Sequence, residues 1–202
     1  MCTLAGEHAL RRRTPSAASL FPLAQLPLAQ LLVATVTTVS AAPTPAIAAL
    51  IRAAVPHHIH TYEHDPRAQS YGTEASELLS DRLKLSPDQI FKTLVVRRSD
   101  GTLAVAVLPV TRSLSLKRAA TALATRKLVM AERVEAERST GYVFGGISPL
   151  GQKRALPTVV DDSALHWSRV LCSGGRRGLE VELDPRELVR LTRAVTAPVA
   201  AH

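Results

Sequence analysis

The stretch Phe91-Lys-Thr-Leu-Val-Val-Arg-Arg-Ser-Asp-Gly-Thr-Leu-Ala-Val-Ala-Val-Leu-Pro109 decides the fold. Two runs rich in Val, Leu and Ala, residues 91–98 and 102–109, flank the turn signal Ser99-Asp100-Gly101. Asp-Gly between two such runs is a strong hairpin signal, because glycine accepts the positive φ that tight hairpin turns need. The stretch therefore predicts a pair of antiparallel strands.

Helical and extended segments surround this hairpin. Thr44-Pro45 is typical of a helix start, and Pro56 ends that helix. Ser86-Pro87-Asp88-Gln89 is a capping box with proline at the first helical position. Further strands are expected over residues 57–63, 127–130, 158–160, 169–172 and 178–183, and further helices over residues 73–79, 114–123 and 132–138 and from Asp184-Pro185 onward.

Strands occur in groups, and a long alternation of strand and helix is absent, so a doubly wound parallel sheet is not expected. The sequence predicts an α/β chain of the α+β type. Its mixed β-sheet is strongly curled and barrel-like, and short helices flank it. We expect one domain over residues 43–202.

Composition limits the function classes. The 202 residues include 46% hydrophobic residues, enough for a globular core, and only two cysteines, Cys2 and Cys172. A disulfide scaffold and a Cys-rich zinc module are therefore excluded. The net charge of +8 favours polyanionic partners, with nucleic acid ahead of anionic lipid, and no membrane partner is expected.

Residues 1–42 differ from the rest of the chain. Arg11, Arg12 and Arg13 precede an apolar run and the small residues Ser40-Ala41-Ala42, which resembles a secretory signal. Prolines at positions 22 and 27 break the apolar run, which is too interrupted for a transmembrane helix. We expect a disordered extension, or a translation start placed too far upstream.

Two segments could carry metal or nucleophile chemistry. The tract His57-His58-Ile59-His60-Thr61-Tyr62-Glu63-His64 could bind a metal, but no second cluster of ligands completes a site, so an edge strand is favoured and no metal is expected. Cys172 lies in the apolar run Val170-Leu171-Cys172, which favours a buried, inert thiol.

Three features could bind a ligand. Lys92 near the start of an apolar strand either lays its stem on the sheet or presents a half-buried cation to a phosphate or oxyanion. Segments 145–151 and 173–178 are glycine-rich and could hold a small ligand with backbone groups, or simply form tight turns. Neither has the spacing of a dinucleotide or Walker-type loop.

Taken together in order along the chain, these motifs resemble one family, the free-standing Cys-tRNA(Pro) deacylases of the YbaK type. That family belongs to the superfamily of the editing domain inserted in bacterial prolyl-tRNA synthetases. The resemblance runs from about Thr44 to the C-terminus and rests on these segments: Thr44-Pro45-Ala46, His60-Thr61-Tyr62-Glu63-His64-Asp65-Pro66, Tyr71-Gly72, Phe91-Lys92-Thr93-Leu94, Thr140-Gly141-Tyr142, Gly145-Gly146-Ile147-Ser148-Pro149-Leu150-Gly151-Gln152-Lys153 and Ser173-Gly174-Gly175-Arg176-Arg177-Gly178-Leu179.

The resemblance implies trans-editing of mischarged Cys-tRNA(Pro), and also of Cys-tRNA(Cys), in the cytoplasm. The thiol of the substrate attacks its own ester, so neither a protein nucleophile nor a cofactor is needed. It implies Lys92 as the catalytic residue, with its amine at the rim of a cavity floored by the glycine loop. The implied substrate-binding residues are Tyr62, Tyr71, Thr93, Gly145, Gly146, Ser148 and Ser173.

The basic residues Lys153, Arg154, Arg176 and Arg177 are candidates for the tRNA backbone on electrostatic grounds, with a solvated surface as the alternative. Prolyl-tRNA synthetase is a further expected partner. The alternatives are a deacylase for Ala-tRNA(Pro) or another small aminoacyl-tRNA, and a tRNA- or synthetase-binding module without turnover. Segment 77–87 departs from the family, and we expect it to alter only a surface loop.

Overall fold

A computed structural model describes residues 43–63 and 71–201 of the chain, with side chains from residue 74 in the second range. The predicted extension, residues 1–42, lies outside the described residues. All described residues belong to one compact unit.

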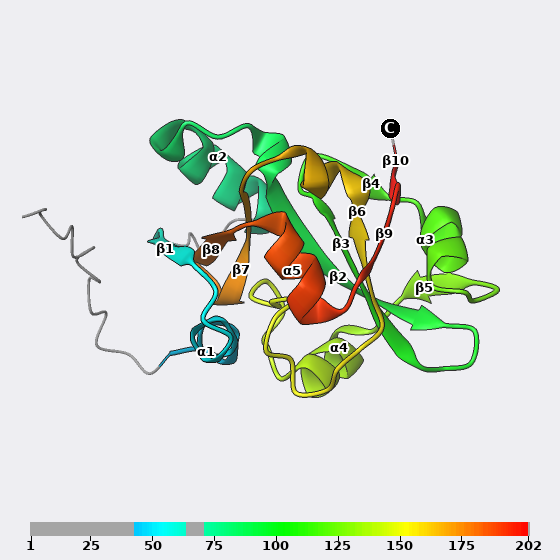
Figure 1. Ribbon diagram of the computed structural model, residues 1–202. Helices are drawn as coiled ribbons and strands as arrows, with labels where there is room; N and C mark the ends of the chain where they lie inside the picture. Colours follow the sequence, from blue (N-terminus) through cyan, green and yellow to red (C-terminus); the bar gives the residue numbers. More distant parts are fainter. Residues whose placement is uncertain (1–42, 64–70, 202) are drawn as a thin grey trace, which may run out of the picture. The chain divides into compact units, whose positions relative to one another are not determined.

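Eight strands form one mixed sheet with the order β1-β8-β7-β2-β3-β6-β9, and β5 pairs with β2 beside this path (Figure 1). The pairs β2–β7, β3–β6 and β6–β9 are parallel, and the other pairs are antiparallel. The strands of this sheet are β1 His57–Thr61, β2 Ile90–Arg98, β3 Leu103–Pro109, β5 Leu128–Met130, β6 Thr158–Asp161, β7 Val170–Arg176, β8 Leu179–Leu183 and β9 Val195–Ala197. A separate pair consists of β4 Ser113–Leu114 and β10 Ala200–Ala201.

The predicted hairpin lies at the centre of the sheet. Strands β2 and β3 pair over seven residues, and Gly101 in the turn has a φ of +82°. Strand β7 pairs with the first two residues of β2, whereas β5 pairs with its last three. The middle of β2 is therefore a place where the sheet splits.

Local sequence signals set the helix starts. Thr44 caps α1 (Pro45–Arg52) and accepts a hydrogen bond from the backbone of Ile47. The capping box from Ser86 to Gln89 forms as predicted around the short 3₁₀ helix η1 (Pro87–Gln89). The other helices are α2 Tyr71–Leu83, α3 Leu116–Ala122, α4 Arg133–Thr140, α5 Pro185–Thr192 and the 3₁₀ helix η2 Asp162–His166.

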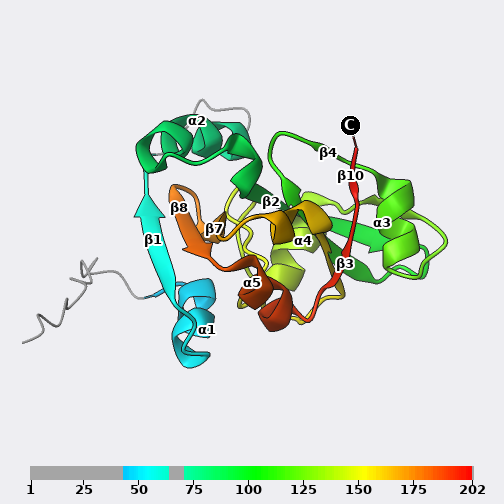
Figure 2. The same cartoon turned by 45° about the horizontal axis from the view of Figure 1, so that its top comes forward.

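Helices cover both faces of the sheet. Buried residues of α1, α4 and α5 join one core cluster with Phe91 and Val95 of β2. On the opposite face, α2 packs over Ile90 and Leu171, and α3 packs over Val96. Figure 2 shows α2 near the β1 edge of the sheet and α3 toward the other end. The face under α2 is the one that carries the candidate site.

The predicted α+β class is confirmed, with a mixed sheet and short flanking helices. Among the described strands the sheet stays open, with β1 and β9 at its edges, although the prediction described it as barrel-like. The prediction of a surface loop over residues 77–87 is wrong for its first half, because α2 continues to Leu83. No helix in the described residues is long and apolar enough to cross a bilayer.

Candidate active site

Lys92 lies near the start of β2, and backbone carbonyls hold its side-chain amine. Nζ donates hydrogen bonds to the carbonyl oxygens of Val110, 3.2 Å away, and Arg112, 2.5 Å away. Burial lowers the pKa of Lys92. An ammonium group has three donors, so two carbonyls leave one for a further acceptor. The cation is thus fixed where β2 begins and β3 ends.

Lys92 and Ser173 point to the same face of the sheet. The residues that precede them, Phe91 and Cys172, are neighbours in the parallel β2–β7 pair, and both point into the core under α1. Because successive residues of a strand point to opposite faces, Lys92 and Ser173 point to the side covered by α2. Ser173 is half-buried, and its hydroxyl accepts a hydrogen bond from the backbone of Gly175.

Glu180 is a buried carboxyl on this face that the sequence analysis missed. It stands opposite Ser173 in the antiparallel β7–β8 pair, while its neighbours Leu179 and Val181 point into the other core cluster. No hydrogen bond or ion pair reaches its side chain from the described part of the chain. Burial raises the pKa of Glu180 to about 8. An unpaired carboxyl that titrates near neutral pH is typical of a functional site.

Glu182 shows what a paired carboxyl looks like two residues further along β8. Its oxygens accept from His60, 2.7 Å away, and from Arg169, 2.8 Å away. Burial raises the pKa of Glu182, but these two hydrogen bonds outweigh burial and lower it overall. The alternation Leu-Glu-Val-Glu-Leu over residues 179–183 could have signalled two carboxylates on one face.

Tyr62 follows β1 and packs against the hydrophobic cluster under α2. Its backbone N–H donates to the carbonyl of Gly178 at 3.0 Å, which ties it to the β7–β8 hairpin. Burial, and then the charges of Glu180 and Glu74, raise the pKa of the Tyr62 phenol. The structure therefore places this predicted site residue close to Glu180. The side chain of Tyr71 lies outside the described atoms.

Thr93 differs from Lys92 in its orientation. It shares a face with Phe91 and Val95, whose side chains lie in the core under α1. Its hydroxyl oxygen is buried and has no hydrogen-bond partner within the described residues. Thr93 and Lys92 therefore serve opposite sides of β2, and the role of Thr93 in substrate binding stays a prediction.

The two glycine loops lie against each other. A Cβ on Gly146 would lie 2.8 Å from the Cα of Arg176, so only glycine fits this approach without a shift of backbone. Gly145 has a φ of +86°, and the Arg177 guanidinium donates two hydrogen bonds to the carbonyl of Phe144. The loop and the β7–β8 hairpin thus form one unit.

Ser148 stands apart from this contact. It is fully buried, and its hydroxyl accepts the backbone N–H of Leu150 at 3.2 Å. Among the described residues, no hydrogen bond joins Lys92 to either glycine loop. The cavity expected beside Lys92, and the roles of Ser148, Gly145 and Gly146 in it, stay predictions.

The other candidates for chemistry have structural roles. Cys172 is fully buried, and burial raises the pKa of its thiol, so the thiolate nucleophile is disfavoured. In the His tract, His57 contacts the carbonyl of Val55 and His60 pairs with Glu182. Over residues 43–63 and 71–201, no group of three metal-ligating side chains comes together.

The predicted tRNA-binding residues lie at two places. Arg176 and Arg177 are on the β7–β8 hairpin, and Arg176 is exposed. Lys153 and Arg154 are exposed after the glycine loop, whose ends are joined by a hydrogen bond from the Lys153 backbone to Thr140 at 2.8 Å. This closure sets Arg154 close to α4.

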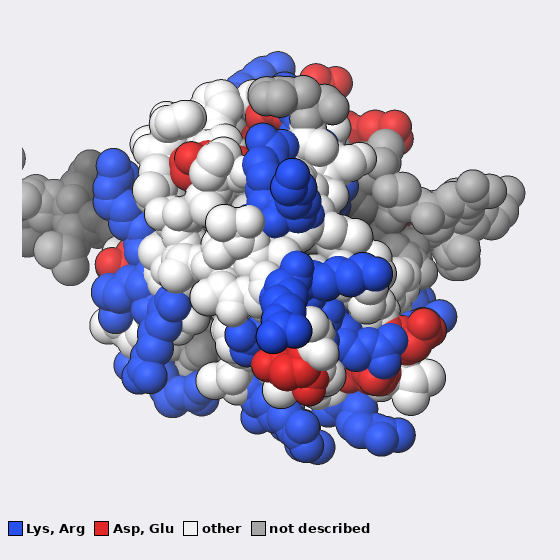
Figure 3. Space-filling model, turned by 90° about the vertical axis from the view of Figure 1, so that its right-hand side faces the viewer, with Lys and Arg blue, Asp and Glu red and all other residues white. Residues whose placement is uncertain are grey.

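Arg154 lines a groove of about 560 Å³ between the β2–β3 hairpin and α4, together with Arg98 and Arg138. Glu135 also lines it but pairs with Arg97 at 3.3 Å. Within the described residues, Arg138 and Arg154 have no side-chain partner. Figure 3 shows Lys and Arg side chains gathered on the face that carries this end of the sheet. Free guanidinium groups in a groove suit a phosphate backbone.

The chain is similar in sequence to known proteins. The family described as "Aminoacyl-tRNA editing domain" matches residues 72–191. A protein of Enterococcus faecalis, provisionally named Cys-tRNA(Pro)/Cys-tRNA(Cys) deacylase EbsC, is 33% identical over 145 residues, which cover 72% of this chain and 88% of that protein. The range that the family matches, residues 72–191, contains Lys92, Ser173 and Glu180.

Two solved structures show the same fold. The hypothetical protein APE2540 is 28% identical with a TM-score of 0.65, and the match covers 75% of this chain and 96% of that one. A protein described provisionally as a trans-editing enzyme for prolyl tRNA synthetase is 23% identical with a TM-score of 0.62, and the match covers 72% and 87% of the two chains.

Proposed function

Because the chain belongs to the family of aminoacyl-tRNA editing domains, we propose that it is a free-standing deacylase that hydrolyses mischarged Cys-tRNA(Pro), and also Cys-tRNA(Cys). The name of the Enterococcus faecalis relative supports this substrate. The observation that carries the proposal is the grouping of Lys92, Ser173 and the unpaired Glu180 on one face of the sheet. In ester cleavage without a protein nucleophile, a cation can stabilise the developing oxyanion, and a titrating carboxyl can carry a proton.

The need for such an enzyme follows from size. Cysteine and proline are similar in volume, and apolar pockets separate such side chains by only about 1–3 kcal/mol. A synthetase therefore mischarges at a rate that calls for a second, hydrolytic site. A site that uses the thiol itself would reject proline, because prolyl esters carry no thiol.

We propose a substrate-assisted reaction. Where Glu180 is ionised, its carboxylate takes the proton of the cysteine thiol, and the sulfur forms a bond to the ester carbonyl carbon of the same residue. Because burial raises the pKa of Glu180 to about 8, this ionised form becomes more abundant as the pH rises toward 8. The bond from that carbon to the ribose oxygen then breaks, the ribose oxygen takes the proton from Glu180, and a cyclic thioester leaves. Water opens the thioester to give free cysteine. Holding thiol and ester together on a rigid site lowers the barrier through pre-organisation.

The remaining side chains position the aminoacyl group and stabilise the charge that develops on it. The third N–H donor of Lys92 is available for the carbonyl oxygen that gains negative charge, or for the phosphate of the terminal nucleotide. Ser173, opposite Glu180, can accept or donate at the aminoacyl group. Tyr62, Tyr71 and the glycine loops would shape the pocket around it.

The tRNA backbone would lie in the groove of Arg98, Arg138 and Arg154. Arg176 and Arg177 would contact it at the β7–β8 hairpin. Arg98 ends the strand on which Lys92 lies, and six residues of strand span about 20 Å. The single-stranded 3′ end of a tRNA can span that distance between the groove and Lys92. The substrate is an intermediate of translation, so the proposed location is the cytoplasm, with prolyl-tRNA synthetase as a partner.

The experiment is a deacylation time course of the purified chain on Cys-tRNA(Pro) and Ala-tRNA(Pro). The proposal expects cysteine to be released faster than alanine. Faster release of alanine would replace it by the alternative, a deacylase for Ala-tRNA(Pro) or another small aminoacyl-tRNA. Binding of both charged tRNAs without release would indicate the module without turnover.

A further inference from the structure

A second pocket, distinct from the arginine groove, is lined by Pro109 and Arg112, at either end of the segment whose carbonyls hold the Lys92 amine. Its volume is about 270 Å³, close to the lower end of the range for small-ligand sites, about 300 Å³. Arg112, whose carbonyl accepts from Lys92 at 2.5 Å, directs its side chain into this pocket. The pocket and the candidate active site therefore share one wall.

Strand topology explains why a pocket forms there. The parallel strands β3, β6 and β9 all end at this edge of the sheet, at Pro109, Asp161 and Ala197. The carboxyl ends of neighbouring parallel strands commonly bound a ligand-binding crevice. Strand β2 runs antiparallel to β3, so Lys92 near its start lies at the same edge.

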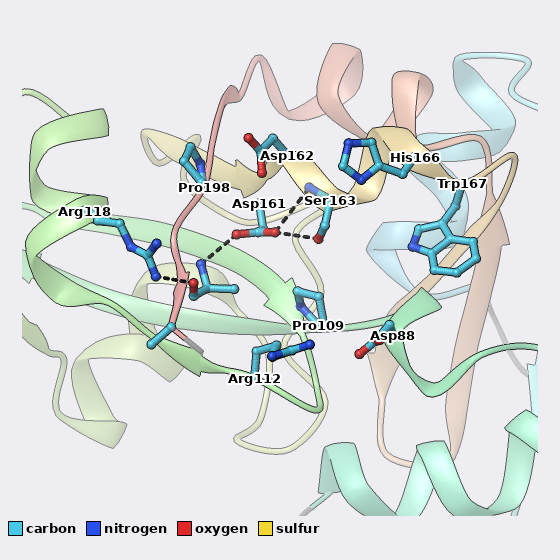
Figure 4. A pocket seen from close by; sticks show the side chains of 12 residues that line it. Asp88, Pro109, Arg112, Arg118, Asp161, Asp162, Ser163, His166, Trp167 and Pro198 are labelled. Carbon is cyan, nitrogen blue, oxygen red and sulfur yellow. Dashed lines mark hydrogen bonds between the residues drawn. The ribbon is translucent and has the colours of Figure 1, made fainter.

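Asp161 keeps this pocket open and rigid. It is buried, and its carboxylate accepts the backbone N–H group of Val199 at 2.8 Å. It also accepts those of Ala200 and Ser163 at 2.7 and 3.2 Å (Figure 4). These bonds fix the C-terminal strands against η2. Asp161 is thus fully used in the structure and is not itself free for a ligand.

Two other side chains of the pocket are engaged, since Asp88 accepts from Thr111 and Arg118 donates to the carbonyl of Ala200. Within the described residues, no hydrogen bond or ion pair occupies the side chains of Arg112, His166, Trp167 or Asp162. In Figure 4, Trp167 lies on one side of the pocket above Asp88, and Arg118 lies on the opposite side. Arg112 and His166 are exposed, and Trp167 is half-buried. An aromatic ring, cations and carboxylates therefore surround one small cavity.

This set of groups matches one chemical class, a nucleoside monophosphate unit. A base stacks on an aromatic ring such as Trp167, a phosphate pairs with Arg112, and a ribose hydroxyl donates to a carboxylate such as Asp162. The carboxylates disfavour a polyphosphate, because each additional negative charge meets Asp88 and Asp162.

We propose that this pocket binds the terminal adenosine nucleotide of the tRNA, and so anchors the 3′ end while the ester lies beside Lys92. The inference rests on the proposed function for the identity of the nucleotide. A purine is expected to bind more tightly than a pyrimidine, because its larger ring system stacks over more of Trp167.

Trp167 provides a direct readout, because it is the chain's single tryptophan. The full chain is titrated with 5′-AMP, 5′-CMP and inorganic phosphate while Trp167 fluorescence is recorded. We expect saturable quenching by 5′-AMP, at least fivefold weaker apparent affinity for 5′-CMP, and no change with phosphate. Arg112→Ala and His166→Ala keep the reporter and should each weaken 5′-AMP binding at least fivefold. Arg186→Ala, an exposed position on α5, is the matched control and should bind like wild type.

No quenching by 5′-AMP, or equal affinity in the Arg112 and His166 variants, would overturn the inference. The same titrant should inhibit deacylation of Cys-tRNA(Pro) competitively, and binding without competition would also overturn it. Failure of the proposed function has a different signature: the wild-type chain then releases no amino acid from any charged tRNA, whatever the fluorescence shows.

Discussion

Ser173 on β7 and Glu180 on β8 stand directly opposite each other in an antiparallel pair, and the carboxyl of Glu180 is buried without a partner among the described side chains. Two residues away, Glu182 has two partners and a lowered pKa. Unlike Glu182, Glu180 therefore has no hydrogen bond or ion pair from the described residues that offsets the cost of its burial. Such a group costs stability, and a catalytic role explains why a site would hold it.

Replacing the carboxyl by an amide should reveal this cost. The pKa of Glu180 is raised from 4.5 to about 8, so between these values the unfolded chain has released a proton that the folded chain keeps. Stability should therefore fall as pH rises from about 4.5 to 8. Glu180→Gln removes that slope and should stabilise the chain at pH 8 by on the order of 2 kcal/mol, with little effect at pH 4.5. Thermal unfolding at both pH values measures this, and equal effects at the two pH values would contradict it.

Loss of the Lys92 cation should remove activity without unfolding the chain. Lys92→Met keeps the apolar stem and is expected to lower kcat by about 10²- to 10³-fold, as for removal of one oxyanion donor. Lys127→Met, an exposed position before β5, is the control and should act like wild type. Single-turnover rates and the Tm of each variant are the measurements. Near wild-type turnover in Lys92→Met would show that the amine is not part of the reaction.

The contact between the glycine loop and the β7–β8 hairpin should not accept a methyl group. In Gly146→Ala the new Cβ would meet backbone atoms of Arg176 and Arg177 at 2.8–2.9 Å, so we expect a loss of about 1–3 kcal/mol and lower activity. Gly101→Ala is the comparison, because a Cβ there meets nothing within 4 Å. Its positive φ costs about 1–2 kcal/mol but should leave kcat unchanged. Equal activity in the two variants would show that the glycine loop does not contribute to the active site.

Charge reversal in the arginine groove should weaken tRNA binding rather than chemistry. Arg138→Glu and Arg154→Glu should each raise KM for charged tRNA and reduce the slope of log affinity against log salt by about 1. Arg52→Glu, exposed on α1 and outside the groove, carries the same charge change as a control. If all three variants lowered affinity equally, net charge and not the groove would govern binding.

Much of the fold could be predicted from local chemistry. The Asp100-Gly101 turn, the Thr44 cap and the capping box at Ser86 each depend on a few adjacent residues, and each forms as predicted. The three-residue strand β9 was not predicted. It forms because β6 lies alongside, and a short segment such as Val195–Ala197 carries no signal of that pairing.

The site was harder to predict than the fold. Lys92 was singled out because a lysine in an apolar strand is locally unusual, and its catalytic role, which the family resemblance implied, stays a prediction. Glu180 was missed because alternation with Leu179 and Val181 is also the pattern of a solvent-facing strand, and the local sequence does not show that Tyr62 and α2 lie on that face. The split of β2 between β7 and β5 likewise depends on contacts between distant parts of the chain.

The central claim is that the substrate's own thiol attacks its ester on the face that carries Lys92 and Glu180. Its most direct test compares single-turnover deacylation of Cys-tRNA(Pro) and Ser-tRNA(Pro), since the two substrates differ only in sulfur against oxygen. The account predicts release of cysteine at least 100-fold faster than release of serine, and loss of that advantage in Glu180→Gln. Equal release of serine and cysteine would contradict it.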